Sequence, residues 1–335
     1  MPHKGLFTQG MAILLRKTPP LAAIEKRLAD FPIVKRNEAS GASPFGGGPS
    51  LLVAFRPDVN GYVLIELVDR RWPDQMGDPK TDADVFAAWG MGSFGPAAWP
   101  GGLERACQHA FFWPEAGSVV AQHQVFIRIL CSYVLGEKGK GNASLRPVDY
   151  RPLPELEFVT RIAAALVGLP DALCCFNPNG ECVQRASEFH DTLSHCASAK
   201  LMPLPLWSNV RLFTLSDMQP KWNFMDTVGM MQLDAPDHEA CFELDAHDPG
   251  AVGNFLRNAS AYVVHNGPII HDGNTMDGAG IRWRAFSVKE GLVIPPRATI
   301  RWLPEDGRKV PERFFASIAD AEQSRAARSH FSRHP

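Results

Sequence analysis

The chain has 335 residues, and its 34 Lys and Arg against 36 Asp and Glu give a formal net charge of −2 at pH 7. A chain this close to neutral carries no general field that attracts nucleic acid or an anionic membrane surface. Hydrophobic residues make up 45% of the sequence and charged residues 21%, close to the averages of globular proteins, which excludes wholesale disorder. We therefore expect a folded protein that binds neither nucleic acid nor membranes.

No segment resembles a signal peptide, because the apolar residues 11–15 are followed at once by Arg16 and Lys17. No stretch approaches the ~20 apolar residues that span a bilayer. The seven cysteines are an odd number and are too sparse for a small secreted disulfide scaffold. These features predict a cytoplasmic protein.

Strand and helix signals are mixed from the start of the chain. Residues 11–15 predict a strand, and apolar residues at helical spacing after Pro19 and Pro20 predict a helix over 20–31. Two apolar runs, 51–55 and 62–68, predict a hairpin. Further on, Thr81 and Asp84 have the spacing of a capping box and predict a short helix that buries Trp89.

Residues 119–131 alternate between apolar and polar side chains, which predicts a strand with His123 on its apolar face. Pro152 and Pro154 introduce a predicted helix, residues 172–176 predict a buried strand, and a second helix is expected after the turn at 177–180.

In the C-terminal part, residues 198–206 predict a connection and Asp248-Pro249 predicts the cap and start of a helix. A last helix is expected from Pro311, burying Phe314, Phe315, Ile318 and Ala321. The predicted strands of this part are 210–215, 229–233, 241–244, 262–264, 281–286 and 299–303.

Helices interspersed with hairpins favour an α+β protein with mixed or antiparallel sheets covered by helices. We expect two subdomains, an N-terminal one over residues 1–200 and a C-terminal one over 201–335.

Cysteines and histidines gather in one segment and contain enough soft ligands for zinc. They lack a CxxC pair, and a helical stripe through Cys182 and Cys196 favours small buried hydrophobes instead. We therefore predict no metal site at this group, although the residues leave the question open. The group consists of Cys174, Cys175, Cys182, His190, His195 and Cys196.

Catalytic motifs are missing: the chain has no P-loop, no dinucleotide fingerprint and no Gly-x-Ser-x-Gly elbow, so no cofactor is expected. His123 is the alternative candidate for a catalytic base, working with a carboxylate such as Asp272 or Asp226 that the fold would have to bring near it. The simpler interpretations are a hydrogen-bonded core histidine and, at Asp272-Gly273, a hairpin turn.

Two segments are candidates for binding a protein. The acidic segment 234–248 includes Asp237 and Glu239, and its default interpretation is a strand, turn and strand with solvated charges. The second segment is rich in Gly and Pro and carries aromatic side chains, which serve either as core or as a binding surface. Its aromatic residues are Trp72, Trp89, Phe94, Trp99, Phe111, Phe112 and Trp113, of which Trp89, Trp99 and Trp113 are our candidate contacts.

The C-terminal half resembles the uncharacterised bacterial family DUF4261, best over residues 208–303. The resemblance rests on Asp226-Thr227-Val228-Gly229-Met230, on residues 241–244 and 252–256, on Gly267-Pro268-Ile269-Ile270-His271-Asp272-Gly273-Asn274-Thr275 and on Trp283. It implies no known chemistry and no catalytic residues. Such proteins occur in toxin-and-immunity or secretion gene neighbourhoods, including type VI secretion.

Together these features predict a non-catalytic protein-binding protein, most concretely an immunity or accessory protein that neutralises a bacterial effector toxin. The alternative is a hydrolase that uses His123 with a nearby carboxylate.

Overall fold

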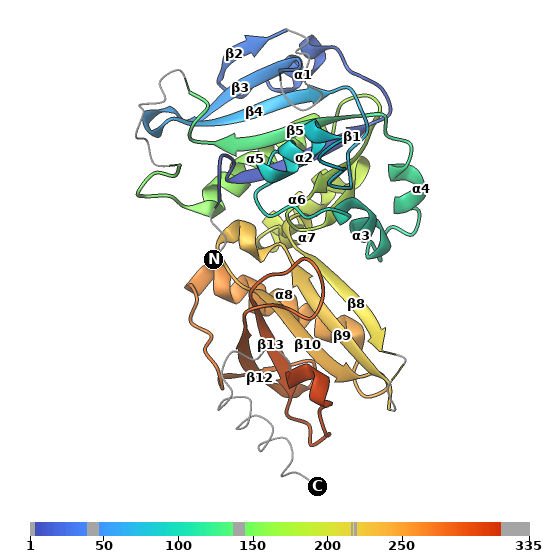
Figure 1. Cartoon of the computed structure of the whole chain (residues 1–335). Helices are drawn as coiled ribbons and strands as arrows, with labels where there is room; N and C mark the ends of the chain where they lie inside the picture. The colour runs from blue at the N-terminus through green and yellow to red at the C-terminus, as the bar shows by residue number, and fades with distance from the viewer. Residues whose placement is uncertain (1–3, 39–46, 137–144, 216, 218–219, 316–335) are drawn as a thin grey trace. The chain divides into compact units, whose positions relative to one another are not determined.

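The computed structural model describes residues 4–38, 47–136, 145–215, 217 and 220–315. Two compact units divide the chain between Trp207 and Ser208 (Figure 1). The sequence placed this boundary a few residues earlier, at residue 200.

The N-terminal unit is built on an antiparallel seven-stranded sheet with the strand order β2-β3-β4-β5-β1-β6-β7. All seven residues of β1 are buried, because this strand lies in the interior of the sheet and is covered on both faces. The strands are β1 (Gln9–Leu15), β2 (Ile33–Asn37), β3 (Ser50–Arg56), β4 (Gly61–Val68), β5 (Val125–Ser132), β6 (Ala172–Asn177) and β7 (Cys182–Arg185).

Helices cover both faces of this sheet. On one face, Phe158 of the long helix α5 packs against Phe55 of β3, and α5 also contacts β1 and β5. On the other face, α2, α3 and α4 share a core with Ala12 and Leu14 of β1. The helices are α1 (Leu21–Arg27), α2 (Ala83–Gly90), α3 (Gly102–Gln108), α4 (Ala116–Val120), α5 (Pro152–Leu166), α6 (Phe189–Ser198) and α7 (Leu204–Trp207).

The C-terminal unit contains a mixed six-stranded sheet with the order β11-β12-β13-β10-β9-β8, in which only β10 and β13 run parallel. Helix α8 (Pro249–Asn266) packs through Phe255 and Leu256 on one face of the sheet. The strands are β8 (Asn209–Leu215), β9 (Trp222–Val228), β10 (Asp237–Glu243), β11 (Thr275–Gly278), β12 (Ile281–Val288) and β13 (Thr299–Pro304).

The second face of this sheet is covered by the chain that follows β12, without an α-helix among the described residues. Phe314 and Phe315, in the short 3₁₀ helix Glu312–Phe315, join a core with Trp222, Phe224 and Leu303 of the sheet. Among its described residues, the N-terminal unit contains two 3₁₀ turns, Pro57–Val59 in the β3-β4 hairpin and Ala186–Glu188 before α6.

The predicted α+β class is confirmed, since an antiparallel and a mixed sheet are both packed with helices. The hairpin of β3 and β4, the helix α5 and the cap of α8 are also as predicted. At that cap, the Asp248 carboxylate accepts hydrogen bonds from the N–H groups of Gly250 and Ala251.

Four predicted elements of the chain are wrong. The strand expected over 119–131 begins only at Val125, because Ala116 and Val120 are buried one helical turn apart in α4. The helix expected after the turn at 177–180 begins only at Phe189, as α6, because the strand β7 comes first. The residues 229–233 form a 3₁₀ turn (Met230–Leu233), and 262–264 belong to α8, where tertiary packing overrides β-branched propensity.

Three further predictions need correction. The capping box at Thr81 is not formed, since α2 begins after Asp82 without a side-chain cap. The turn of the β11-β12 hairpin lies at Ala279-Gly280, both with positive φ, and not at Asp272-Gly273. Of the last predicted helix, Phe314 and Phe315 are buried in a 3₁₀ turn, whereas Ile318 and Ala321 lie outside the described residues.

Candidate functional site

Four charged residues lie side by side across the C-terminal sheet. The strand registers pair Arg211 with Asp226, Asp226 with Glu239, and Glu239 with Arg301, so that the row crosses β8, β9, β10 and β13. All four residues are fully buried, with 0% of their surface exposed. The sequence predicted solvated charges in 234–248, which is wrong for Asp237 and Glu239, because β10 is an interior strand buried on both faces.

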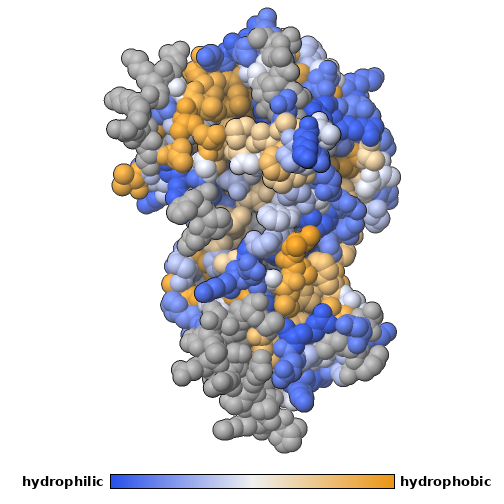
Figure 2. Space-filling view, viewed as in Figure 1, coloured by the Kyte–Doolittle hydropathy of each residue, from blue (hydrophilic) through white to orange (hydrophobic). Residues whose placement is uncertain are grey.

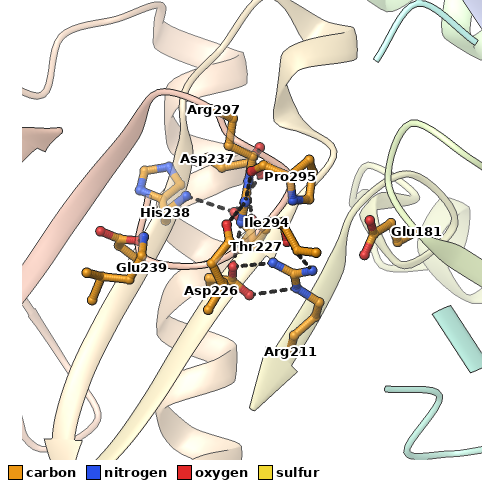
Figure 3. A network of polar contacts seen from close by, with 12 residues as sticks. Glu181, Arg211, Asp226, Thr227, Asp237, His238, Glu239, Ile294, Pro295 and Arg297 are labelled. Atoms are coloured by element: carbon orange, nitrogen blue, oxygen red, sulfur yellow. Dashed lines mark hydrogen bonds and ion pairs between the residues drawn. The ribbon is translucent and has the colours of Figure 1, made fainter. Parts of the chain in front are cut away.

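Asp226 is the centre of this network and is shared by two arginines (Figure 3). Arg211 donates from Nε and Nη2 to the two carboxylate oxygens, at 2.9 and 2.6 Å. Arg297, from the segment between β12 and β13, donates from Nη2 to Oδ2 at 2.5 Å. Arg211 comes from β8 and Arg297 from the segment between β12 and β13. By binding both guanidinium groups, Asp226 joins the segment between β12 and β13 to the sheet.

Asp237 lies beside this pair and receives a full set of donors. Its Oδ1 accepts from the Thr227 hydroxyl at 2.8 Å and from the Met230 N–H at 3.2 Å. Its Oδ2 lies 3.2 Å from Arg297 Nε and accepts from the Gly229 N–H at 3.4 Å. Gly229 has a φ of 130°, a conformation that favours glycine and that turns its N–H toward this carboxylate.

Glu239 and Arg301 form the other end of the row. Arg301 Nε and Nη2 both lie 2.5 Å from Glu239 Oε1, and Oε2 accepts from the Leu292 N–H at 3.2 Å. Arg301 Nη1 donates to the Phe314 carbonyl at 2.9 Å, which attaches the C-terminal 3₁₀ turn to the sheet.

The remaining arginine donors bind carbonyl groups of the 293–295 segment. Arg297 Nη1 donates to Pro295 at 2.7 Å and to Val293 at 3.1 Å, and Arg211 Nη1 donates to Ile294 at 2.9 Å (Figure 3). The network therefore holds this segment over the second face of the sheet.

Three acids and three arginines balance one another in this interior. Burial opposes the charge of Arg297, but the carboxylates of Asp226 and Asp237 outweigh it and raise its pKa. Burial raises the pKa of Asp237 and of Glu239, against the opposing charges of Arg297 and Arg301. A buried acid that is paired in this way serves structure, since its lone pairs are already used.

His238 points to the opposite face of the sheet, among the α8 core. Its Nδ1 accepts from Trp302 Nε1 at 3.1 Å, and the two rings stack with centroids 6.2 Å apart. Burial lowers the pKa of His238 to about 3, so the imidazole is neutral at pH 7. Its Nε2 has no hydrogen-bond partner in the described part of the chain.

His123 is held by the backbone of the N-terminal unit. Its Nε2 accepts from the Trp72 N–H at 2.9 Å, and its Nδ1 lies 2.5 Å from the Val120 carbonyl, which requires the proton on Nδ1. Burial lowers the pKa of His123. Both ring nitrogens are thus occupied, as expected for the core histidine and not for a catalytic base. It lies in a turn before β5 and not on a strand face.

Asp272, the suggested partner of His123, belongs to the C-terminal unit. Its Oδ1 accepts from the Ser287 N–H at 2.5 Å, and the neighbouring His271 N–H donates to Asn274. These contacts fix the turn before β11. The structure therefore gives His123 and Asp272 separate structural roles.

The cysteine and histidine segment does not gather into a metal site. Within the described residues, no group of three or more His, Cys, Asp or Glu side chains is placed to hold a metal ion. Cys174 and Cys175 are buried in β6, Cys182 lies on β7, and Cys196 lies on α6, with no helical stripe joining the last two. None of the seven cysteines, all of which lie in the described residues, forms a disulfide, and His190 and His195 lie on α6.

The aromatic segment is divided between core and surface. Trp89 and Trp113 are buried in the core shared with α2, α3 and α4, together with Trp72 and Phe94. Trp99 is 43% exposed, and the adjacent Phe111 and Phe112 are 53% and 95% exposed. Of our three candidate contacts, only Trp99 lies on the surface.

Six large apolar residues of this segment are exposed, and we call these six residues together the aromatic face. All six lie on α2 or in the connections that flank α2 and α3, on the helical layer that covers one side of the N-terminal sheet. In Figure 2, the deepest orange on the N-terminal unit lies over the region of β3 and β4, and the region of α2 and α3 is paler, so the aromatic face is defined by residue exposure and not by hydropathy colour. The residues of the aromatic face are Met76, Phe86, Met91, Trp99, Phe111 and Phe112.

The fold and the site define an α+β protein with a charge-balanced interior in its C-terminal unit and an aromatic face on its N-terminal unit. Residues 226–303 match the family described as "Domain of unknown function (DUF4261)", as the resemblance implied. This segment contains every acid of the charge network together with Arg297 and Arg301, whereas Arg211 lies just outside it. No curated protein and no solved structure shows a significant match to the chain. Among the described residues, no helix has both the length and the apolar character needed to cross a bilayer.

Proposed function

We propose that this protein is a non-catalytic cytoplasmic protein that binds another protein through the aromatic face. The observation that carries the proposal is the exposure of aromatic side chains there. Among the described residues, five large aromatic side chains are exposed, namely Phe86, Trp99, Phe111, Phe112 and Tyr262, and the first four belong to this face. Single exposed apolar residues are ordinary, but a concentration of Trp, Phe and Met is typical of binding surfaces.

The titratable groups that we considered for catalysis support the same proposal. The acids of the C-terminal network are neutralised by arginines, and both nitrogens of His123 are bound by backbone groups. A binding protein needs no reactive group, only a complementary surface of about 800 Å² per partner. The hydrolase alternative has no such support from the geometry.

The finer proposal is an immunity or accessory protein that neutralises a bacterial effector toxin, such as one delivered by type VI secretion. It rests on the resemblance to DUF4261 and on the aromatic face, because an immunity protein acts by covering its toxin. We place the contact on Trp99, Phe111 and Phe112, in place of the buried Trp89, Trp113, Asp237 and Glu239.

The test is affinity purification of the tagged full chain from its native bacterium, followed by mass spectrometry. We expect the wild type to retain a stoichiometric protein partner and Trp99→Ala/Phe111→Ala/Phe112→Ala to lose it. The matched control is Val34→Ala/Leu201→Ala/Ile269→Ala, which removes three other exposed apolar side chains and should retain the partner.

Two results would contradict the proposal: no stoichiometric partner for the wild type, or equal recovery with the face variant and the wild type. Circular dichroism of each variant checks that it is folded. For the finer proposal, co-expression of the recovered partner in a host without this chain should slow growth, and the wild-type chain should restore it.

A further inference from the structure

Exposed acidic side chains come from the same segment as the aromatic face. Asp78, Asp82 and Asp84 are exposed at the start of α2, and Glu104 is exposed on α3. Asp82 and Phe86 lie one helical turn apart, so a carboxylate and an aromatic ring share the outer side of α2. Carboxylates and exposed rings thus occupy the same helical layer.

The fold leaves these four carboxylates without a cation. None of them forms an ion pair with another described residue, whereas Glu115, on the α3-α4 connection, pairs with Arg185 at 2.9 Å. Two basic residues lie in the surrounding segment 74–118: Lys80 is exposed, and Arg105 is already bound to Glu181 at 2.5 Å. The face therefore carries a local negative charge on a chain whose formal net charge is only −2.

Helix capping does not account for these acids. Asp74 caps α3, where its two oxygens accept from the N–H groups of Leu103 and Glu104 at 2.7 and 2.9 Å. By contrast, Asp82 precedes α2 without a side-chain cap. Asp84 and Glu104 lie in the first turns of α2 and α3, where the helix dipole favours an acid, and Glu104 also accepts from Gln108 Nε2 at 3.2 Å. Within the described chain, Asp82, Asp84 and Glu104 are still left without a cation, which a partner can supply.

We propose that the partner bound by the aromatic face presents a basic, arginine-rich surface. This inference rests on the proposed function and specifies the chemistry of the partner. Uncompensated carboxylates attract a cationic surface and disfavour an acidic one, so they select the partner and speed its encounter. A guanidinium group can also lie over an exposed indole or phenyl ring while it pairs with a carboxylate, so the two kinds of side chain act together.

Two fluorescent peptides test the charge preference of the full chain, one alternating Arg and Leu and one alternating Glu and Leu. By fluorescence anisotropy, we expect the Arg peptide to bind at least about tenfold more tightly than the Glu peptide. Binding should weaken at least about fivefold between about 50 and 300 mM NaCl, because exposed charges are screened.

Matched variants locate the binding. Asp82→Asn/Asp84→Asn/Glu104→Gln removes three charges from the face, and we expect it to weaken the Arg peptide about tenfold. The control Asp30→Asn/Asp58→Asn/Glu157→Gln removes three exposed charges elsewhere on the N-terminal unit and should stay within about twofold of wild type. Equal weakening by both variants would show non-specific attraction and overturn the inference.

The partner recovered from the native bacterium separates this inference from the proposed function. If its binding needs Trp99, Phe111 and Phe112 but is unaffected by loss of the three carboxylates, the inference is wrong and the proposed function stands. If no partner is recovered, the proposed function fails, and with it the inference, whatever the peptides do. If the partner is lost with the aromatic triple variant and also with the carboxylate triple variant, the proposed function and the inference are both supported.

Discussion

The two units bury charge in different ways. In the N-terminal unit, Arg128 Nε and Nη2 donate to Glu66 Oε2 at 2.8 and 2.5 Å, and Arg105 forms a second pair with Glu181. In the C-terminal unit, Asp226 is shared by Arg211 and Arg297, and Arg297 also contacts Asp237. These two arginine–carboxylate contacts of the first unit each join one arginine to one acid, whereas those of the second form a network.

The difference follows from what covers each sheet. Helices α2, α3 and α4 satisfy part of their backbone groups within each helix, and Arg128 Nη1 of β5 donates to the Ser93 carbonyl of this layer at 3.3 Å. The segment between β12 and β13 has no helix among its described residues, so the carbonyls of Val293, Ile294 and Pro295 need donors from elsewhere. Arg211 and Arg297 supply them, and the acids balance the charge that these arginines bring into the interior.

The largest effect should come from removing the shared arginine. Arg297→Met removes a positive charge that lies beside Asp226 and Asp237. It also leaves the carbonyls of Val293 and Pro295 without the donor that Arg297 supplies. We expect the free energy of unfolding to fall by about 3–5 kcal/mol, the cost of leaving a buried charge uncompensated. Urea unfolding, with hydrogen exchange of peptides from each unit, should place the loss in the C-terminal unit.

A surface pair of the same unit is the control for this variant. Arg282 pairs with Asp277 at 3.0 Å, and both side chains are more than half exposed. Arg282→Met should change the free energy of unfolding by less than about 1 kcal/mol. A similar loss for both variants would show that the network contributes no more than a solvated pair.

A double variant should separate a pair from a network. Arg128→Met leaves the buried Glu66 carboxylate without its arginine, with the Gly48 N–H still donating to it at 3.2 Å, and should cost about 3 kcal/mol. Glu66→Leu/Arg128→Met should recover most of that loss, because neither charge of the pair remains. Asp226→Leu/Arg297→Met should recover little, because Arg211 and Asp237 each lose a partner. Equal recovery in the two units, measured by urea unfolding, would contradict the distinction.

The buried histidine of the C-terminal unit should give a smaller, pH-dependent effect. Burial lowers the pKa of His238 to about 3, whereas an unfolded histidine titrates near about 6.5. As the pH falls below about 6.5, the unfolded chain binds a proton that the native chain does not. Stability therefore falls with decreasing pH, by up to about 1.4 kcal/mol per pH unit from this group.

His238→Phe removes this titration while keeping a ring against Trp302. The difference in unfolding free energy between wild type and variant should shift in favour of the variant as the pH is lowered from about 7 to about 5. His265→Phe, at an exposed position of α8, is the control for the loss of a histidine, and the shift for His238→Phe should exceed the shift for this control. A constant difference for His238→Phe would mean that the native His238 takes up a proton in this range.

Periodicity predicted the α+β class and elements such as α5, because their apolar residues face one core. It missed β9, since Trp222–Val228 is buried on both faces and its Asp226 interrupts the apolar run. It also placed Asp237 and Glu239 on the surface, because the sequence does not show that arginines about 60 residues further along the chain neutralise them. The available signal was Arg211 and Arg301, each inside an apolar strand, where a buried charge requires a buried partner.

The smallest predicted effect compares two helix starts, one in each unit. Asp248 caps α8 with two hydrogen bonds to backbone N–H groups, so Asp248→Ala should lower the free energy of unfolding by about 1 kcal/mol. Thr81→Ala should cost less than about 0.5 kcal/mol, because the side chain makes no cap at α2 and donates only to Asp82 at 3.4 Å. Equal losses in urea unfolding would mean that the capping box of the sequence forms in solution, and that α2 begins earlier than the structure shows.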